Sequence, residues 1–85
     1  MSTTAIVLTM DQMLVLQQIY EDFEDDIENL MRSMRLNRGQ LHGILESLKR
    51  KGLLIFEHRK GQGMPLVRVS QRGRRLIADM WGSQK

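Results

Sequence analysis

Three polar side chains in the segment NRGQLHGILESLKRKGLL, residues 37–54, have the chemistry needed to read the edges of DNA bases. The guanidinium group of an arginine can donate two hydrogen bonds to O6 and N7 of guanine, and the amide of a glutamine can pair in the same way with N6 and N7 of adenine. Arg38, Gln40 and His42 are therefore candidates for base contacts. The alternative for each is ordinary exposure to solvent at the start of a helix.

The charges of the chain are divided along its length. Residues 1–31 contain seven acidic residues and no lysine or arginine, whereas residues 32–85 contain 13 basic and three acidic residues, so charges of −7 and +10 sum to +3. This division favours a polyanionic partner for the second part, the alternative being two solvated faces of opposite sign. Contacts to phosphate groups would position such a partner without reading its sequence. The candidates for them are Arg32, Arg35, Lys49, Arg50, Arg59, Lys60 and Arg68.

Other kinds of chemistry find little support in the sequence. The acidic run EDFEDDIE, residues 21–28, lacks the spacing and the glycine of a calcium-binding loop, so a solvated junction between helices is favoured over a metal site or a mimic of DNA. His42 and His58 are not spaced as a pair of metal ligands, and the chain has no cysteine. We find no nucleophile with a suitably spaced base and no phosphate-binding glycine loop. We therefore expect neither enzymatic activity nor a metal or other cofactor.

Three helices are predicted in the first part of the chain, where capping pairs precede apolar residues at helical spacing. The capping pairs are Thr9 with Gln12, Asp25 with Glu28, and Asn37 with Gln40. The helices that they begin are predicted to cover Met10 to Tyr20 or Phe23, about 26–35, and about 37–51. Gly52 is a natural stop for the third helix.

A β-hairpin and a last helix are predicted for the remainder. The segment LLIFEHR is rich in branched and aromatic residues, KGQGMP contains chain-breaking residues, and LVRVS alternates arginine with valine, which together indicate a hairpin with a basic tip at about 53–70. Ser70 caps a helix at about 71–81. Its first turn carries Arg72, Arg74 and Arg75 against the helix dipole, which favours a functional reason such as phosphate contact. The predicted fold is a single α+β domain over residues 1–85, mainly α with a small β-hairpin, in the order α-α-α-β-β-α.

The third predicted helix contains two glycines, Gly39 and Gly43, and each costs about 1 kcal/mol relative to alanine in a helix. Helical spacing puts them on the face opposite to the apolar residues Leu41, Ile44, Leu45 and Leu48. We expect the missing side chains to let the helix backbone approach a phosphate group or the wall of a groove closely. The alternative is that the fold simply tolerates two surface glycines.

Two short helices joined by a three-residue turn and followed by a hairpin form the winged helix-turn-helix arrangement, whose second helix enters the major groove of DNA. Over residues 7–80 the chain resembles the DNA-binding domain of the MarR-type winged-helix regulators. The resemblance rests on LTMDQMLVLQQI for the helix that leads into the motif, LNRGQLHGILESLKRKGLL for the recognition helix, and VSQRGRRLI for the end of the wing and the start of the next helix.

The resemblance implies a sequence-specific, double-stranded DNA-binding transcription regulator. The positions that would face DNA are Arg59 and Lys60 on the wing and, on the recognition helix, Arg38, Gly39, Gln40, His42, Gly43 and Ser47. The chain departs from the family pattern at Gly43, where relatives carry longer polar or basic side chains, and in KGQGMP, which lacks their aspartate-x-arginine pair. The alternative is a winged-helix module that binds proteins or acts as an accessory factor in a nucleic-acid complex.

Assembly and location can also be predicted. The last helix carries an apolar stripe that a helix this short can bury only in part on its own domain, so we expect a homodimer, the alternative being a monomer whose core this helix closes. The candidate dimer residues are Leu76, Ile77, Met80 and Trp81. The start MSTTAIVLTM has only four consecutive strongly apolar residues, too few for a signal sequence or a membrane span, and we expect a soluble cytoplasmic protein. The sequence assigns no small-molecule effector.

Overall fold

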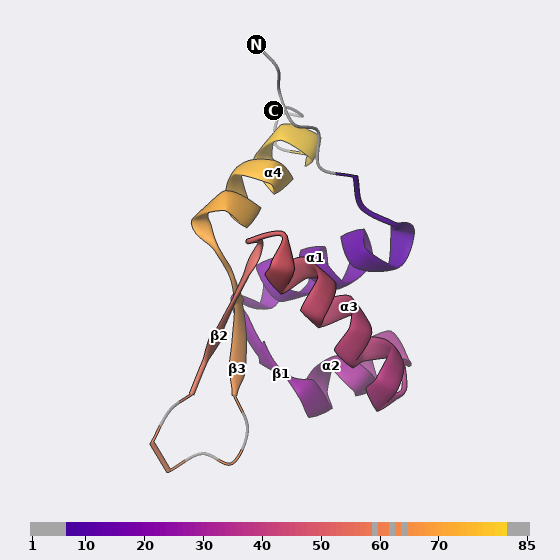
Figure 1. Ribbon diagram of the computed structural model, residues 1–85, viewed down its shortest axis with the longest axis vertical. Helices are drawn as coiled ribbons and strands as arrows, with labels where there is room; N and C mark the ends of the chain where they lie inside the picture. Colours follow the sequence, from indigo (N-terminus) through magenta and orange to yellow (C-terminus); the bar gives the residue numbers. More distant parts are fainter. Residues whose placement is uncertain (1–6, 59, 62, 64, 82–85) are drawn as a thin grey trace.

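The computed structural model describes residues 7–58, 60, 61, 63 and 65–81. Four helices and a three-stranded antiparallel sheet make up the fold, which confirms the predicted α+β winged helix (Figure 1). The elements follow the predicted order, with one additional strand between the first two helices. They are α1 (Met10–Asp22), β1 (Glu24–Asp26), α2 (Ile27–Met34), α3 (Arg38–Arg50), β2 (Leu54–Glu57), β3 (Leu66–Val69) and α4 (Gln71–Trp81).

Capping boxes begin α1 and α3, as the sequence predicts. The Thr9 hydroxyl accepts a hydrogen bond from the Gln12 N–H at 3.1 Å, and Gln12 Oε1 accepts one from the Thr9 N–H at 2.9 Å. Asn37 and Gln40 make the same reciprocal pair, at 2.8 and 3.1 Å. Each box satisfies backbone donors that the first turn of a helix leaves without partners. The start of α3 is therefore set by two of its own polar side chains.

The additional strand β1 corrects the prediction of a solvated junction at residues 21–28. The chain turns at Phe23, whose φ of 72° ends α1, and β1 then pairs with β3, with Asp25 opposite Val67. Because side chains alternate along a strand, Asp25 points inward and is only 5% exposed. The cap of α2 is also one residue later than predicted, since Asp26 Oδ1 accepts the hydrogen bond from the Asn29 N–H at 2.7 Å.

Among the described residues, no cation contributes to the pKa shift of the buried Asp25 carboxyl. Burial is the largest cause that raises its pKa to about 7, and a hydrogen bond with Asp22 and the charges of Asp22 and Asp26 raise it further. The Asn29 side-chain amide, which donates to Asp25 Oδ1, acts in the opposite direction. Asp25 Oδ2 is buried and has no hydrogen-bond acceptor or donor among the described residues that meets ordinary geometry. This carboxyl is therefore mostly neutral in the folded protein below about pH 7.

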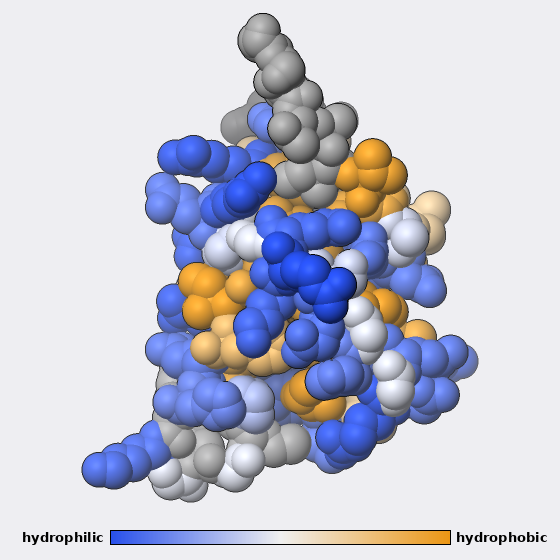
Figure 2. Space-filling view, in the orientation of Figure 1, coloured by the Kyte–Doolittle hydropathy of each residue, from blue (hydrophilic) through white to orange (hydrophobic). Residues whose placement is uncertain are grey.

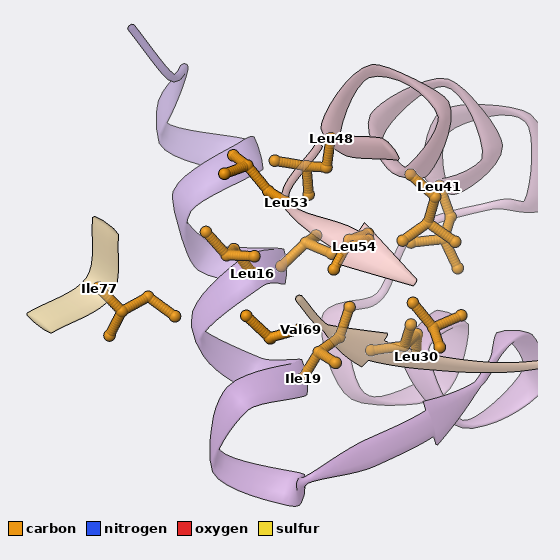
Figure 3. Packing of buried hydrophobic residues seen from close by; sticks show 12 residues of the cluster. Leu16, Ile19, Leu30, Leu41, Leu48, Leu53, Leu54, Val69 and Ile77 are labelled. Carbon is orange, nitrogen blue, oxygen red and sulfur yellow. The ribbon is translucent and has the colours of Figure 1, made fainter. Parts of the chain in front are cut away.

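The core lies between the three-helix layer and the sheet. Figure 3 shows side chains from α1, α2, α3 and the sheet that converge on one apolar cluster, among them Leu16, Leu30, Leu41 and Leu54. The buried members of this cluster are Val15, Leu16, Ile19, Leu30, Leu41, Leu45, Leu48, Leu53, Leu54, Val67, Val69 and Ile77. Leucines thus supply most of the core, and partly buried methionines such as Met31 and Met34 pack at its margin.

The backbone of α4 packs closely against the base of the hairpin at Gly73. A Cβ atom on Gly73 would lie 2.5 Å from the Leu53 carbonyl oxygen and 2.6 Å from Val69 Cγ1, so only glycine permits this approach. Ser70 caps α4 as predicted, because its Oγ accepts from the Gly73 N–H at 3.0 Å while it donates to the Gly52 carbonyl at 2.6 Å. Gly52, at φ +78°, ends α3 in the left-handed conformation that favours glycine.

Candidate nucleic-acid interface

Helices α2 and α3 form the helix-turn-helix pair. Arg35, at φ 57° in the left-handed region, ends α2, and the Leu36 N–H donates to the Met31 carbonyl at 3.2 Å. After this short turn, α3 begins at Arg38. The core face of α3 is made of Leu41, Leu45 and Leu48, so its opposite face is turned away from the domain. The turn therefore leaves the side of α3 that carries Gly39, His42 and Gly43 exposed to solvent.

The exposed face of α3 carries no side chain at two positions, as the sequence predicts. A Cβ atom added to Gly43 would meet nothing within 4 Å, and one added to Gly39 would meet only Asn37 Oδ1, at an ordinary contact distance of 3.5 Å. Both residues are exposed. The fold itself consequently has no steric need for glycine at either place, in contrast to Gly73.

Most of the polar side chains that are candidates for base contacts already make a hydrogen bond or an ion pair within the domain. Gln40 Oε1 is held by the Asn37 N–H, and Arg38 Nη2 forms an ion pair with Glu28 Oε2 of α2 at 3.1 Å. This ion pair is exposed on both sides, so solvent screens it and its contribution to stability is small. His42 is exposed and makes no hydrogen bond or ion pair within the described part of the chain.

Ser47 differs from the other candidates for base contacts. It is half-buried, and its Oγ accepts a hydrogen bond from Gln12 Nε2 of α1 at 2.7 Å. The side chain therefore faces the domain, which argues against a base contact. The sequence identified Gln12 as a capping residue, but only the packing of α1 on α3 shows that its side-chain amide also reaches Ser47.

Most candidates for phosphate contacts are exposed. The exposed ones lie at the end of α2, at the end of α3 and on the wing: Arg32, Arg35, Lys49, Arg50 and Lys60. The ammonium group of Lys49 also lies 5.1 Å from the centre of the Phe56 ring, which orients its side chain along β2. Arg59 lies outside the described residues. At the start of α4, Arg72, Arg74 and Arg75 are exposed as well.

Arg68 has a different environment from these residues. It lies in β3, where its side chain is about one third exposed, and its Nη1 is 3.8 Å from Glu57 Oε1. Its guanidinium carbon is 5.6 Å from the centre of the Phe23 ring. Because its alkyl chain and charge are already engaged on the outer face of the sheet, Arg68 is a poorer candidate for a phosphate contact than the residues at the ends of α2 and α3.

The wing and the start of α3 lie at the same end of the molecule. Figure 1 shows the β2–β3 hairpin extending from the body toward this end, while α4 lies at the opposite end. In the same orientation, hydrophilic side chains cover most of the visible face, and apolar side chains appear at the upper right, near the start of α1, and in patches at the left and in the lower centre (Figure 2). This end of the molecule thus combines the start of α3 with the hairpin.

The dimer candidates on α4 are only partly available to a partner. Ile77 is 5% exposed and belongs to the core, which argues against a role in a dimer interface. Leu76 and Trp81 pack at the margin of the core and remain half-buried, as does Met80. Among the described residues, no helix is long and apolar enough to cross a membrane.

Solved structures of MarR-family regulators have the same fold. A mutant MarR from E. coli complexed with operator DNA matches with a TM-score of 0.80, at 20% identity over 85% of this chain and 52% of that chain. AbfR bound to DNA, in its overoxidized form, matches with a TM-score of 0.80, at 18% identity over 89% of this chain and 57% of that chain. NadR in complex with 4-hydroxyphenylacetate also has a TM-score of 0.80, at 22% identity over 86% of this chain and 52% of that chain.

These comparisons define the class of the domain. The chain has the MarR-type winged-helix fold, and it spans about half the length of the solved structures that it matches. No family model matches the sequence, and no curated protein matches it either. In this fold α2 and α3 are the helix-turn-helix pair, and the β2–β3 hairpin is the wing.

Proposed function

We propose that this protein is a sequence-specific, double-stranded DNA-binding transcription regulator of the cytoplasm, with α3 in the major groove and the wing on the DNA backbone. The observation that carries the proposal is the arrangement around α3. One face of this helix is turned away from the core. Exposed basic residues lie on either side of it, at the end of α2, at the end of α3 itself and on the wing. Cations in these places suit a phosphate backbone on either side of a groove.

The comparisons support DNA as the partner. MarR from E. coli and AbfR were both solved with DNA, and both have the fold of this chain. A winged helix can also bind proteins, but such a module has no requirement for basic residues around its exposed helix. DNA is thus favoured over a protein as the partner of α3.

The polar residues of α3 differ in what a base contact would require. His42 can turn to a base edge without losing a partner in the domain. Arg38 would have to exchange Glu28 for guanine, and Gln40 would have to give up the capping bond to the Asn37 N–H in order to pair through both its amide atoms. We therefore expect His42 to be the side chain of α3 that contacts a base at the lowest cost.

Selection of bound duplexes from random DNA tests this function. The proposal predicts that a defined sequence is recovered and that the affinity falls steeply with salt, because each neutralised phosphate releases counterions. Recovery of no common sequence, together with an affinity that does not depend on salt, would contradict it and would favour a protein-binding module.

We also propose that the protein forms a homodimer through α4 and the neighbouring start of α1. Leu76, Met80 and Trp81 remain half-buried on α4, while Val7 and Met10 are 79% and 64% exposed near the start of α1. Helices α1 and α4 contact each other, and apolar side chains that remain accessible on both favour an interface. Two-fold pairing would also double the number of phosphate contacts.

Sedimentation equilibrium at tens of micromolar tests the dimer. The proposal predicts a species of twice 9.9 kDa that Trp81→Ala shifts toward the monomer. Asp79→Ala, on the exposed face of the same helix, is the matched control and should leave the dimer intact. A single 9.9 kDa species for the wild-type chain would exclude the dimer under these conditions.

A further inference from the structure

We propose that a proton bound by Asp25 holds strand β1 on the wing strand β3, and that loss of this proton as the pH rises releases β1 and weakens DNA binding. The inference rests on the proposed function, because it requires the helix-turn-helix pair and the wing to contact DNA together. It gives a regulatory role to a buried carboxyl that contacts no DNA itself. The ligand of this site is the proton.

Asp25 lies where the two DNA-contacting parts of the domain are joined. Strand β1 pairs with one edge of β3, and the other edge of β3 pairs with β2 to form the wing. Helix α2 begins directly after β1, and Asp26 of β1 caps it. Strand β1 therefore joins the helix-turn-helix pair to the wing (Figure 1).

The Asp25 carboxyl lacks the partners that a buried charge needs. The residue is only 5% exposed, and its Oδ2 has no hydrogen-bond donor within the described part of the chain. Its Oδ1 accepts from the side-chain amide of Asn29 in α2, which is a neutral donor. Burial of a carboxylate with so little compensation is costly, whereas the neutral acid carries no charge to solvate. The geometry thus favours a bound proton while β1 is in place.

The charges near Asp25 are mostly negative. The charged residues on β1 and on the neighbouring parts of α1, α2 and β3 are Glu21, Asp22, Glu24, Asp26, Glu28 and Arg68. Arg68 is opposite Glu24 in the register, one position along from Asp25, so it projects from the other face of the sheet. Its guanidinium group is near the Phe23 ring there. Burial first, and then the hydrogen bond and charge of Asp22, raise the pKa of Asp25 to about 7.

Loss of the proton favours opening of β1. The strand has three residues, all acidic, and lies at an edge of the sheet, so it can leave β3 without removing an apolar side chain from the core. In the open form Asp25 is in water, where its ordinary pKa of 3.8 applies. The ratio of open to closed molecules then rises about tenfold for each pH unit between the two pKa values, or about 100-fold from pH 5 to pH 7.

The affinity for one duplex at pH 5 and pH 8 tests the inference. The probe is the duplex that the wild-type chain selects from random DNA at pH 5, at constant ionic strength. For an open form that makes up about 5% of the molecules at pH 5, an ordinary share for a minor conformation, the affinity should fall about fivefold by pH 8. Asp25→Asn cannot lose a proton and should not show this loss. Histidines also titrate in this range, but both proteins contain His42 and His58, so their effect cancels in the comparison.

A second variant tests the same carboxyl without a change in the core. Asp22 is exposed, and its hydrogen bond and charge raise the pKa of Asp25. We therefore expect Asp22→Asn to lose less affinity than the wild-type chain and to reach its lower plateau at a lower pH. Asp79→Asn removes an exposed carboxyl from α4 and is the matched control, which should behave like the wild-type chain.

Hydrogen exchange at pH 8 locates the opening. We expect the amides that pair β1 with β3, and those at the start of α2, to exchange faster in the wild-type chain than in Asp25→Asn. The amides of α3 should exchange at the same rate in both proteins. Both proteins are compared at one pH, so the intrinsic pH dependence of exchange cancels.

The outcomes separate the inference from the function on which it rests. If the wild-type chain selects no sequence from random DNA, the proposed function fails and the inference fails with it. If it selects a sequence but loses as much affinity as Asp25→Asn between pH 5 and pH 8, DNA recognition stands and the proton-dependent junction is wrong. Faster exchange throughout the wild-type chain would also overturn the inference, because it would show global unfolding. A loss of affinity specific to the wild-type chain, with faster exchange confined to β1 and α2, establishes it.

Discussion

Replacement of Asp25 by asparagine should remove most of a pH dependence of stability that a single buried carboxyl causes. Asp25 lies in β1, is 5% exposed, and has a pKa raised from the ordinary 3.8 to about 7, chiefly by burial. The folded state therefore holds this proton more tightly than the unfolded state does. Stability contributed by the bound proton is complete below pH 3.8, falls as the pH rises toward 7, and falls no further above it.

The magnitude follows from the two pKa values. Each pH unit between them corresponds to about 1.4 kcal/mol, so the free energy of unfolding should decrease by about 4 kcal/mol over the whole range and by about 3 kcal/mol between pH 5 and pH 8. Hydrogen bonds, first from Gln18 and then with Asp25, lower the pKa of Asp22, so its contribution to stability changes near and below pH 3.8. The decrease between pH 5 and pH 8 is therefore attributed to Asp25.

Asparagine reproduces the neutral acid at this place. Its carbonyl oxygen can accept from the Asn29 amide, as Asp25 Oδ1 does, and its NH₂ group carries no charge that burial would penalise. Urea unfolding followed by circular dichroism at pH 5 and pH 8 measures the effect. We expect Asp25→Asn to lose less stability than the wild-type chain between the two pH values and to be the more stable protein at pH 8.

A control variant separates this effect from the loss of one negative charge. Asp79→Asn removes a carboxyl from the exposed face of α4 and should not reproduce the change. The reasoning is refuted if the wild-type chain and Asp25→Asn lose the same free energy between pH 5 and pH 8. It is also refuted if Asp25→Asn is the less stable protein at pH 8.

Three further variants test the site and the hairpin junction. His42→Ala should weaken binding to the selected duplex by about 1 to 3 kcal/mol and leave thermal stability unchanged, whereas an equal loss on unrelated DNA would contradict a base contact. Lys60→Ala should weaken binding to every duplex and reduce the salt slope by about one, and an unchanged slope would remove the wing from the interface. Gly73→Ala should destabilise the fold by about 1 to 3 kcal/mol in urea unfolding, because its Cβ would lie 2.5 Å from the Leu53 carbonyl oxygen; stability equal to wild type would show that α4 moves freely at this contact.

Local patterns in the sequence predicted most of the fold. The capping pairs of α1 and α3, the Ser70 cap of α4 and the stop at Gly52 all depend on residues a few positions apart, so the sequence displays them directly. The strand β1 could not be found in this way. Acidic residues rarely form strands, and EDD becomes one only through its pairing with β3, some 40 residues further along the chain.

The candidate site was predictable in its position and less so in its details. The apolar face of α3 determines which residues lie opposite to it, so the sequence correctly placed Gly39 and Gly43 on the outside. It could not reveal that Ser47 is bonded to Gln12 or that Arg38 is paired with Glu28, because these contacts join separate helices. Whether a polar side chain already has a partner within the domain depends on how the helices pack against each other.

The affinity for two duplexes of equal length and base composition tests the central claim most directly. One is the duplex selected from random DNA, and the other contains the same bases in shuffled order, so the phosphate charges that both present are identical. Sequence-specific binding through α3 predicts that the selected duplex binds on the order of 10³-fold more tightly at physiological salt. Equal affinity for the two duplexes would contradict sequence-specific recognition.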